Sequence, residues 1–364
     1  MVGRRLHQPP TAWLVDARFK PHEEGRPDLL IWDPRVRFPS SEEATQKAMG
    51  GSEVYAVMLC TELVKRGHKV AIAHGGGNFE FRGVQCVNTA QLRSWRCWPT
   101  KSLVVQRSHH IGYPTPPLPP TVVILAHDTY NHGYDVHAPV LSNGRARLIC
   151  NSKWQAAAFK LAKDRRAVYP MVGVAPETEK VKGRFVYGSG VLKGLPDTVG
   201  FWKHLRKRYP EKMRDQRLLI IHPGWGDGYG RYANAAFGIE YAGAPSTEEY
   251  RRLVASAEGL FFVNTYPETW CNLAVIAERA RTRTHILCKV GRCGIPEGLS
   301  DSSLVTDSPI AFEQDFIAHL GAPLPTHPVV DRSPAAMIAT WEEALGLVTP
   351  PSDAALAAPA VGGL

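Results

Sequence analysis

Residues 259–278 read GLFFVNTYPETWCNLAVIAE, and this stretch decides the fold. Its apolar first part, Gly259–Asn264, predicts a buried strand, and the part after Asn272 predicts a helix that runs through Glu278. A short loop joins the two. A buried strand followed at once by a helix is the repeating unit of a parallel sheet whose faces are covered by helices.

The same alternation runs along most of the chain. We expect ten strands in two groups of five: Asp28–Trp32, Lys69–His74, Leu103–Gln106, Val122–Ala126 and Leu148–Asn151, then Phe185–Tyr187, Leu218–His222, Gly259–Asn264, His285–Lys289 and Ser303–Thr306. The stretch Ala167–Glu179 contains two prolines and is the expected break between the groups. The sequence therefore predicts an α/β protein with two Rossmann-like domains that face a cleft.

The expected domains follow from these groups and from the composition of the chain ends. We expect an N-terminal domain over residues 1–169, a C-terminal domain over 170–333, a helix over 334–349 and a flexible tail over 350–364. The proline-rich stretch Gly112–Pro120 predicts an exposed turn. No apolar run approaches the ~20 residues that span a bilayer, and no secretory signal is visible, so a cytoplasmic location is expected.

Composition limits the class of protein without naming its chemistry. The 364 residues are 44% hydrophobic and 21% charged, which is typical of a globular protein and not of a disordered or fibrous chain. A net charge of +9 favours anionic partners such as sugar nucleotides, nucleic acid or membrane surfaces. The seven scattered cysteines form no CxxC or zinc-ligand spacing, so reduced and mostly buried thiols are expected, with no metal site.

Two glycine-containing segments are candidate anion sites. Gly50 and Gly51 precede the predicted helix Val54–Arg66, where free N–H groups and the helix dipole favour a phosphate. The alternative is that Ser52 caps this helix. The second segment, FVYGSGVLKG over residues 185–194, runs from a strand into a glycine-rich loop whose lysine can neutralise a diphosphate or can simply be solvated. It is not a P-loop.

The loop that follows the strand of residues 259–264 holds the third candidate site. Ligands of open α/β sheets bind beyond the carboxyl ends of the strands, which is where Glu268 is expected. A carboxylate there can accept hydrogen bonds from sugar hydroxyls, while N–H groups at the start of the next helix face the ligand. The alternative is a carboxylate that only complements the helix dipole.

Taken together and in order, these motifs resemble those of family-4 glycosyltransferases. The resemblance rests on GGSE with RGHKV, the loop ending in Lys193-Gly194, GAPSTEE from Gly243, and YPETWC; NSKW from Asn151 and CGIPE from Cys293 also fit. It covers roughly residues 28–346. It implies the GT-B fold, with a C-terminal helix that crosses back to the N-terminal domain, and a retaining, metal-independent enzyme that uses nucleotide-diphospho-sugars.

The resemblance also implies roles for particular residues. The catalytic residues would be His127, Lys193 and Glu268, with a buried structural histidine as the alternative at position 127. The donor would be bound by Gly50, Gly51, Gly188, Ser189, Lys193, Gly243, Ala244, Glu268, Thr269, Trp270, Cys271, Asn272 and Glu278. Gly51 and Lys193 would contact the diphosphate, Glu268 the sugar hydroxyls, and the segment at Gly243 the nucleobase.

The sequence departs from the family pattern at two positions. Ser189 stands where the family usually has an arginine, and Ile276 stands where a second glutamate is expected to bind the ribose. The nearest glutamate is Glu278, but two residues along a helix correspond to a rotation of about 200°. Glu278 is therefore not a simple replacement, and the choice of donor can differ from that of the family.

The expected function is a retaining transfer of a sugar from a UDP- or GDP-linked donor, UDP-glucose among them, to an acceptor hydroxyl. No separate cofactor or metal is expected. Acceptors to consider are a carbohydrate, a lipid-linked glycan or hydroxymethylated bases of phage DNA, which the basic stretches Lys160–Arg166 and Lys203–Arg208 could dock. Contact with an anionic membrane surface is also open. The alternatives are a sugar-nucleotide epimerase or hydrolase, and a GT-B-fold binding protein with a degraded site.

Overall fold

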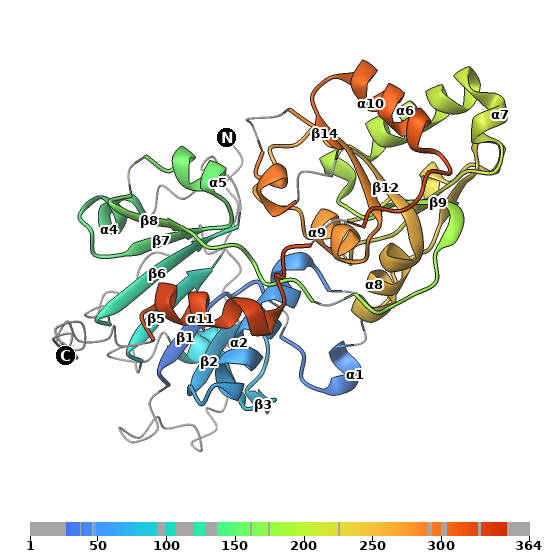
Figure 1. The fold of residues 1–364 in the computed structure, drawn as a ribbon. Coiled ribbons are helices and arrows are strands. Elements are labelled where there is room, and N and C mark those ends of the chain that lie inside the picture. Colours follow the sequence, from blue (N-terminus) through green and yellow to red (C-terminus); the bar gives the residue numbers. More distant parts are fainter. Residues whose placement is uncertain are drawn as a thin grey trace, which may run out of the picture.

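The computed structural model describes residues 27–347, except 37, 46, 48, 93–99, 107–118, 128–136, 161, 174, 225, 290–292, 300–303, 327 and 328. The expected tails, and the proline-rich turn up to residue 118, lie outside the described residues. The described chain forms two bodies, each built on its own sheet (Figure 1). The expectation of an α/β protein with two sheet-based bodies is confirmed.

The first sheet has eight strands in the order β3-β4-β2-β1-β5-β6-β7-β8, and all its pairs are parallel except β3 with β4. The strands are β1 (Leu29–Trp32), β2 (Val70–His74), β3 (Phe79–Phe81), β4 (Val84–Asn88), β5 (Ser102–Gln106), β6 (Thr121–Ala126), β7 (Arg147–Cys150) and β8 (Asp164–Ala167). The five predicted strands of this sheet are confirmed to within a residue at each end. The prediction missed β3, β4 and β8. Strands β3 and β8 are the two edge strands and β4 is next to β3, and a continuous apolar run is not required near a sheet edge.

The second sheet has six parallel strands in the order β11-β10-β9-β12-β13-β14. They are β9 (Val181–Tyr187), β10 (Arg217–Ile220), β11 (Ile239–Tyr241), β12 (Ala257–Val263), β13 (Arg283–Leu287) and β14 (Leu304–Thr306). Strand β9 begins four residues before the predicted strand, because its first residues are mostly polar and gave no apolar signal. Strand β11 was missed because it has only three residues. The two sheets are joined by residues 168–180, where the sequence predicted the break.

Helices cover both sheets, and loops at the carboxyl ends of the strands lead into them. They are α1 (Glu42–Thr45), α2 (Gly51–Lys65), α3 (Thr89–Leu92), α4 (Ala138–Ser142), α5 (Lys153–Ala158), α6 (Leu195–Arg208), α7 (Pro210–Met213), α8 (Thr247–Ser256), α9 (Asn272–Arg279), α10 (Pro309–His319) and α11 (Pro334–Leu345). Short 3-10 turns occur at Val191–Lys193 (η4), Gly230–Tyr232 (η5), Ala235–Phe237 (η6) and Ile295–Gly298 (η7). No helix within the described ranges is long and apolar enough to span a membrane.

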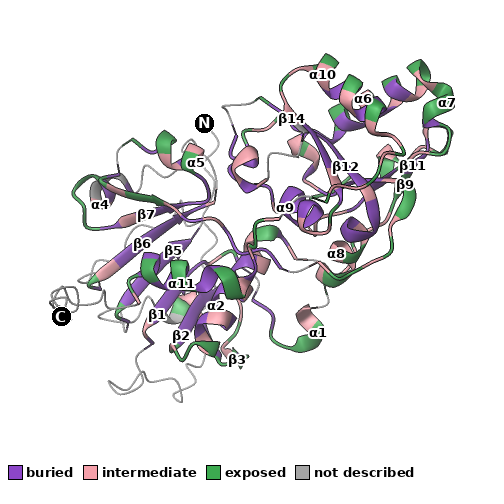
Figure 2. Ribbon diagram, viewed as in Figure 1, coloured by how far each residue is buried: buried purple, intermediate pink, exposed green. Residues whose placement is uncertain are grey.

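Each body has a hydrophobic core, and the buried strands mark it in Figure 2. In the second body Trp202, Phe261 and Phe316 pack edge to face, with ring centroids 4.9 to 6.0 Å apart. Strands that are buried on both faces read as continuous apolar runs, which is why the sequence revealed them.

The last helix belongs to the first body. After the second sheet is complete, the chain returns and α11 lies beside α2 (Figure 1). Trp341 is fully buried, 5.4 Å from the ring of Tyr55, and Glu342 forms ion pairs with Arg66 and His68. The expected crossing of the C-terminal helix back to the N-terminal body is confirmed.

Candidate functional site

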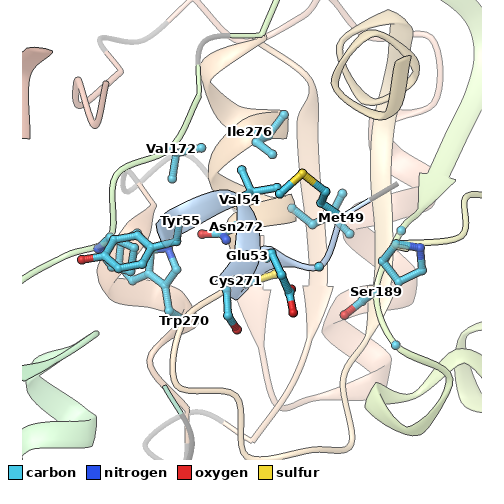
Figure 3. Close-up of a pocket in the computed structure, with 18 of the residues that line it drawn as sticks. Met49, Glu53, Val54, Tyr55, Val172, Ser189, Trp270, Cys271, Asn272 and Ile276 are labelled. Atoms are coloured by element: carbon cyan, nitrogen blue, oxygen red, sulfur yellow. The ribbon is translucent and has the colours of Figure 1, made fainter. Parts of the chain in front are cut away.

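A cavity of about 570 Å³ lies between the two bodies. The first body contributes the start of α2 and His127, the connection contributes Pro170–Gly173, and the second body contributes loops at the carboxyl ends of β9 and β12. Figure 3 shows Ser189 on one side of the start of α2, with Tyr55 and Trp270 on the other. The position beyond the strand ends is where open parallel sheets bind ligands.

Most residues that the sequence singled out line this cavity. They are Gly50, Gly51, His127, Gly188, Ser189, Lys193, Glu268, Thr269, Trp270, Cys271 and Asn272. The cavity lining does not include Gly243, Ala244 or Glu278. Segments that are far apart in the chain therefore meet at one site.

The N-termini of two helices meet at the cavity. Helix α2 begins at Gly51, and α9 begins at Asn272; neither has a side-chain cap. A Cβ added to Gly51 would lie 3.2 Å from the side-chain nitrogen of Asn272, so the glycine allows this close approach. The interpretation of Ser52 as the cap of α2 is wrong, because Gly50 occupies that position. Backbone N–H groups without a side-chain cap favour an anion.

Two tyrosine hydroxyls hold the glycine-rich loop after β9. The Tyr250 hydroxyl donates to the carbonyl of Gly188 (2.6 Å), and the Tyr187 hydroxyl donates to that of Gly190 (2.7 Å). Gly194 has a φ of 106°, and a Cβ there would lie 2.0 Å from the Val263 carbonyl oxygen. Only glycine fits this position. The loop is thereby placed against the end of β12, next to the Glu268 loop.

Lys193 and Glu268 form an ion pair with each other. Glu268 is only 5% exposed, whereas the Lys193 side chain is 24% exposed. Sequence analysis assigned these groups to two separate parts of a ligand, and the structure places them side by side. A cation next to a carboxylate matches a ligand that carries an anionic group close to hydroxyl groups.

The Glu268 loop is anchored from both bodies. The Gly294 N–H donates to the Glu268 carbonyl (2.8 Å), and the Thr269 hydroxyl donates to the His127 carbonyl (2.6 Å) in the first body. Burial raises the pKa of Cys271 to about 12, so this residue of the loop is a neutral thiol at pH 7. All six described cysteines are buried and free. The position of Glu268 therefore depends on how the bodies are packed together.

A second contact joins the bodies beside the cavity. The carboxylate of Glu297, in η7, accepts hydrogen bonds from the N–H groups of Lys153 (2.7 Å) and Trp154 (2.6 Å) at the start of α5. The Tyr169 hydroxyl also donates to it (3.3 Å). The two further segments that support the family resemblance, at 151–154 and 293–297, therefore contact each other directly.

His127 directly follows β6 and lines the cavity. Its ring packs edge to face against the ring of Tyr55, with centroids 5.5 Å apart, and its carbonyl accepts a hydrogen bond from the Thr269 hydroxyl. The residue thus has structural contacts as well as a cavity position. Its catalytic role stays a prediction.

Ser189 and Ile276, the two positions at which the sequence departs from the family that it resembles, both line the cavity. Ile276 lines the cavity and is 6% exposed, whereas the buried Glu278 acts electrostatically on Arg332. Glu278 therefore does not place a carboxylate in the cavity at the position of Ile276.

The Gly243 segment lies next to the cavity without lining it. The Gly243 carbonyl accepts a hydrogen bond from the backbone N–H of His222 (2.9 Å), and His222 lines the cavity. The nucleobase role of this segment stays a prediction.

Sequence reasoning missed the contribution of α8 to the site. Thr247, Tyr250 and Arg251 all line the cavity. The spacing of Thr247 and Arg251 places both on one helix face, but one sequence does not show which face meets a cavity. The described residues contain no group of three or more His, Cys, Asp or Glu side chains that could hold a metal ion.

The basic stretches have structural partners. Lys203 and Lys207 lie over the ring of Phe237, and Arg208 forms an ion pair with Glu313. In the other stretch, Arg166 pairs with acidic side chains. These contacts are those of solvated protein faces.

Comparison with solved structures finds the same architecture in several proteins of low sequence identity. The glycosyltransferase AviGT4 of avilamycin A biosynthesis is 17% identical, with a TM-score of 0.60 over 88% of this chain and 97% of that one. WaaG, a glycosyltransferase of lipopolysaccharide biosynthesis, is 12% identical (TM-score 0.56, 87% and 94% covered). Anabaena HepE in complex with UDP-glucose is 10% identical (TM-score 0.56, 88% and 99% covered). No family model and no curated protein matches the chain.

At these identities the likeness establishes the fold. The chain has the GT-B fold: two bodies built on parallel sheets, with a cavity between them and a C-terminal helix that returns to the first body. A fold can host several functions, so the activity must be argued from the site itself.

Proposed function

We propose that this protein is a retaining glycosyltransferase, which moves a sugar from a nucleotide-diphospho-sugar to an acceptor hydroxyl. The observation that carries the proposal is the convergence of Lys193, Glu268 and two helix N-termini in one cavity between the bodies. Three solved structures of similar fold are glycosyltransferases, and one of them was solved with UDP-glucose.

The donor diphosphate would lie against the start of α2 and against Lys193. Cleavage of the bond between the anomeric carbon and the diphosphate builds negative charge on the leaving group. Lys193 and the uncapped N–H groups would stabilise that charge in the transition state.

Glu268 would bind the hydroxyls of the donor sugar. Its carboxylate is buried beside Lys193, so the sugar and the leaving phosphate would meet the two members of one ion pair. The acceptor hydroxyl would attack from the face that the phosphate leaves, close to His127. This scheme requires no enzyme nucleophile, metal or other cofactor.

The acceptor is proposed to be a carbohydrate or a lipid-linked glycan. Two of the similar structures are glycosyltransferases involved in the biosynthesis of lipopolysaccharide and of avilamycin A, and they give no support to a DNA acceptor. The partnered basic stretches of this chain favour the same choice.

A sugar-nucleotide-binding protein without turnover is the second candidate. The observation that favours it is Ile276, an apolar side chain inside the cavity at the expected position of a ribose-binding carboxylate. Release of the nucleotide diphosphate from a donor separates the two candidates, because only the enzyme breaks the glycosidic bond.

A thermal-shift screen against UDP, GDP and their sugars tests donor binding directly. A ligand at a hundred times its Kd stabilises the folded state by about 2.7 kcal/mol. For a domain of this size, that corresponds to a rise in Tm of roughly 5–10 °C. The free sugars are the control and should give no shift. Absence of a shift with every nucleotide at millimolar concentration would contradict the proposal.

A further inference from the structure

Helix α8 presents two polar groups to the cavity that the proposed function has not used. Thr247 and Arg251 are four residues apart, so they lie on the same face of the helix, and both line the cavity. The other face of α8 is a surface of ordinary ion pairs. There Arg252 forms two hydrogen bonds to Glu249 (2.5 and 2.6 Å).

Neither group has a partner among the described residues. The Thr247 hydroxyl is buried and makes no hydrogen bond. Arg251 forms no ion pair or hydrogen bond; only the charge of Glu248 acts on it, and burial lowers the pKa of its guanidinium. Polar groups that are removed from water are nearly always hydrogen-bonded, so an unmatched hydroxyl and an unmatched guanidinium one turn apart indicate a ligand.

The connection between the bodies makes room for the Arg251 guanidinium. A Cβ added to Gly173 would lie 2.4 Å from the central carbon of this guanidinium and 2.5 Å from one of its nitrogens. Gly173 is not in the left-handed region of backbone conformation, so the glycine supplies space. The guanidinium thus lies in the cavity wall, against the chain that joins the two sheets.

The pairing of charges in the cavity wall leaves the Arg251 guanidinium open to an anionic ligand. The lysines and arginines of the lining are Lys193 and Arg251, and the carboxylates are Glu53 and Glu268. Lys193 is paired with Glu268. Arg251 is therefore the lining cation that lacks an ion-pair partner within the described part of the chain.

The Arg251 guanidinium lies against Gly173, the chain neighbour of Val172. Figure 3 shows Val172 on the side of Ile276 and away from Ser189. We propose that Arg251 and Thr247 form a second anion subsite of the cavity, at the end of Val172 and Ile276, which binds a phosphate group. The planar guanidinium donates two parallel hydrogen bonds to phosphate oxygens, and the threonine hydroxyl donates a third.

This inference deepens the proposed function and rests on it for the class of ligand. Two sources of the phosphate share this chemistry: the diphosphate of the donor, and a phosphate carried by the acceptor sugar. In the first case Arg251 supplies the positive charge that Ser189 cannot. In the second case it selects a phosphorylated acceptor.

Calorimetric titration of the full chain and its variants tests the subsite. The variants are Arg251→Ala and, as the matched control, Arg252→Ala, whose side chain lies on the solvent face of the same helix. The probes are inorganic pyrophosphate, UDP, GDP and glucose 6-phosphate, with uridine and guanosine as phosphate-free controls. We expect Arg251→Ala to weaken at least one phosphate-bearing probe tenfold or more, and Arg252→Ala to leave every affinity within twofold.

The probe that responds identifies the source of the phosphate. A loss for UDP or GDP assigns the subsite to the donor, and a loss confined to glucose 6-phosphate assigns it to the acceptor. Gly173→Ala gives a second test that keeps the arginine, because the new methyl group must displace the guanidinium; the same probe should weaken severalfold. Arg251→Lys, which keeps the charge without the planar fork, should give a similar partial loss.

Three results would overturn the subsite. They are unchanged affinities in Arg251→Ala, a loss for a nucleoside as large as that for its diphosphate, and a wild-type protein that binds no phosphate-bearing probe at millimolar concentration. Failure of the proposed function is a different result, namely arginine-dependent binding of phosphate without release of nucleotide from any sugar donor. Circular dichroism of each variant verifies the fold, and Gly173→Ala decides the matter if Arg251→Ala does not fold.

Discussion

Replacement of Glu268 by glutamine tests the centre of the site with the smallest change in shape. The glutamine keeps one oxygen acceptor but loses the charge that pairs with Lys193 and one of the two acceptor oxygens. Donor-sugar hydroxyls would then be imperfectly paired in a buried position. A site built to hydrogen-bond a hydroxyl discriminates strongly once that pairing is broken.

The structure sets the size of the two expected effects. A charge-assisted hydrogen bond contributes about 1.5–3 kcal/mol. Because the Lys193 side chain is 24% exposed and can turn to water, we expect the free energy of unfolding to fall by only about 1 kcal/mol. That corresponds to a Tm lower by roughly 2–4 °C. Sugar transfer should fall at least tenfold, or about 1.4 kcal/mol in the activation free energy.

Transfer kinetics and nucleotide calorimetry together decide the role of Glu268. Affinity for the bare nucleotide diphosphate should not fall in Glu268→Gln, because the change releases Lys193 from its ion pair. If nucleotide binding collapses along with transfer, Glu268 acts on the loop or on the nucleotide, and its assignment to the sugar hydroxyls is wrong. Unchanged transfer would refute it as well.

Three further changes test other parts of the account. Lys193→Ala should lower donor turnover roughly ten- to a hundredfold, the loss of one charge-assisted hydrogen bond. The Tm should fall by only a few degrees, because the buried carboxylate of Glu268 loses its partner; unchanged turnover at low donor concentration would argue against the diphosphate contact. Burial alone would raise the pKa of Glu342, but hydrogen bonds from Arg66 and His68 outweigh it and hold the pKa below its ordinary value of 4.5. The ionised carboxylate therefore stabilises the fold at pH values above 4.5. At pH 7 the free energy of unfolding of Glu342→Gln should be about 1–3 kcal/mol lower than that of the wild type, and this difference should shrink as the pH falls below 4.5. A difference that does not change with pH in urea titrations would contradict this. Glu297→Ala removes hydrogen bonds between the two bodies. Small-angle X-ray scattering should then show a larger radius of gyration, while the secondary structure stays unchanged. An unchanged radius of gyration would mean that this contact does not hold the two bodies together.

The sequence predicts the sheets well because their central strands are buried on both faces. The run Gly259–Asn264 reads as a strand without help from any neighbour, whereas β8, with its polar residues Asp164–Arg166, gives no such signal at the sheet edge. The C-terminal helix was expected, and its packing on α2 follows from the burial of Trp341.

The site was predictable only in part. The cavity lining could be expected from motifs that end strands or begin helices, because parallel strands bring their carboxyl ends to one edge. The ion pair of Lys193 with Glu268 joins loops 75 residues apart, and it depends on the close approach that Gly194 permits. The contribution of Arg251 depends on which face of α8 meets the cavity, which no local pattern shows.

The most direct test of the central claim is release of nucleotide diphosphate from radiolabelled sugar nucleotides. The wild-type chain should release it from at least one UDP- or GDP-sugar, slowly by hydrolysis and faster once an acceptor is present, and Lys193→Ala should reduce that release at least tenfold. An equal rate in Lys193→Ala, or no release from any donor by a protein that binds the nucleotides, would contradict the claim that this cavity transfers sugars.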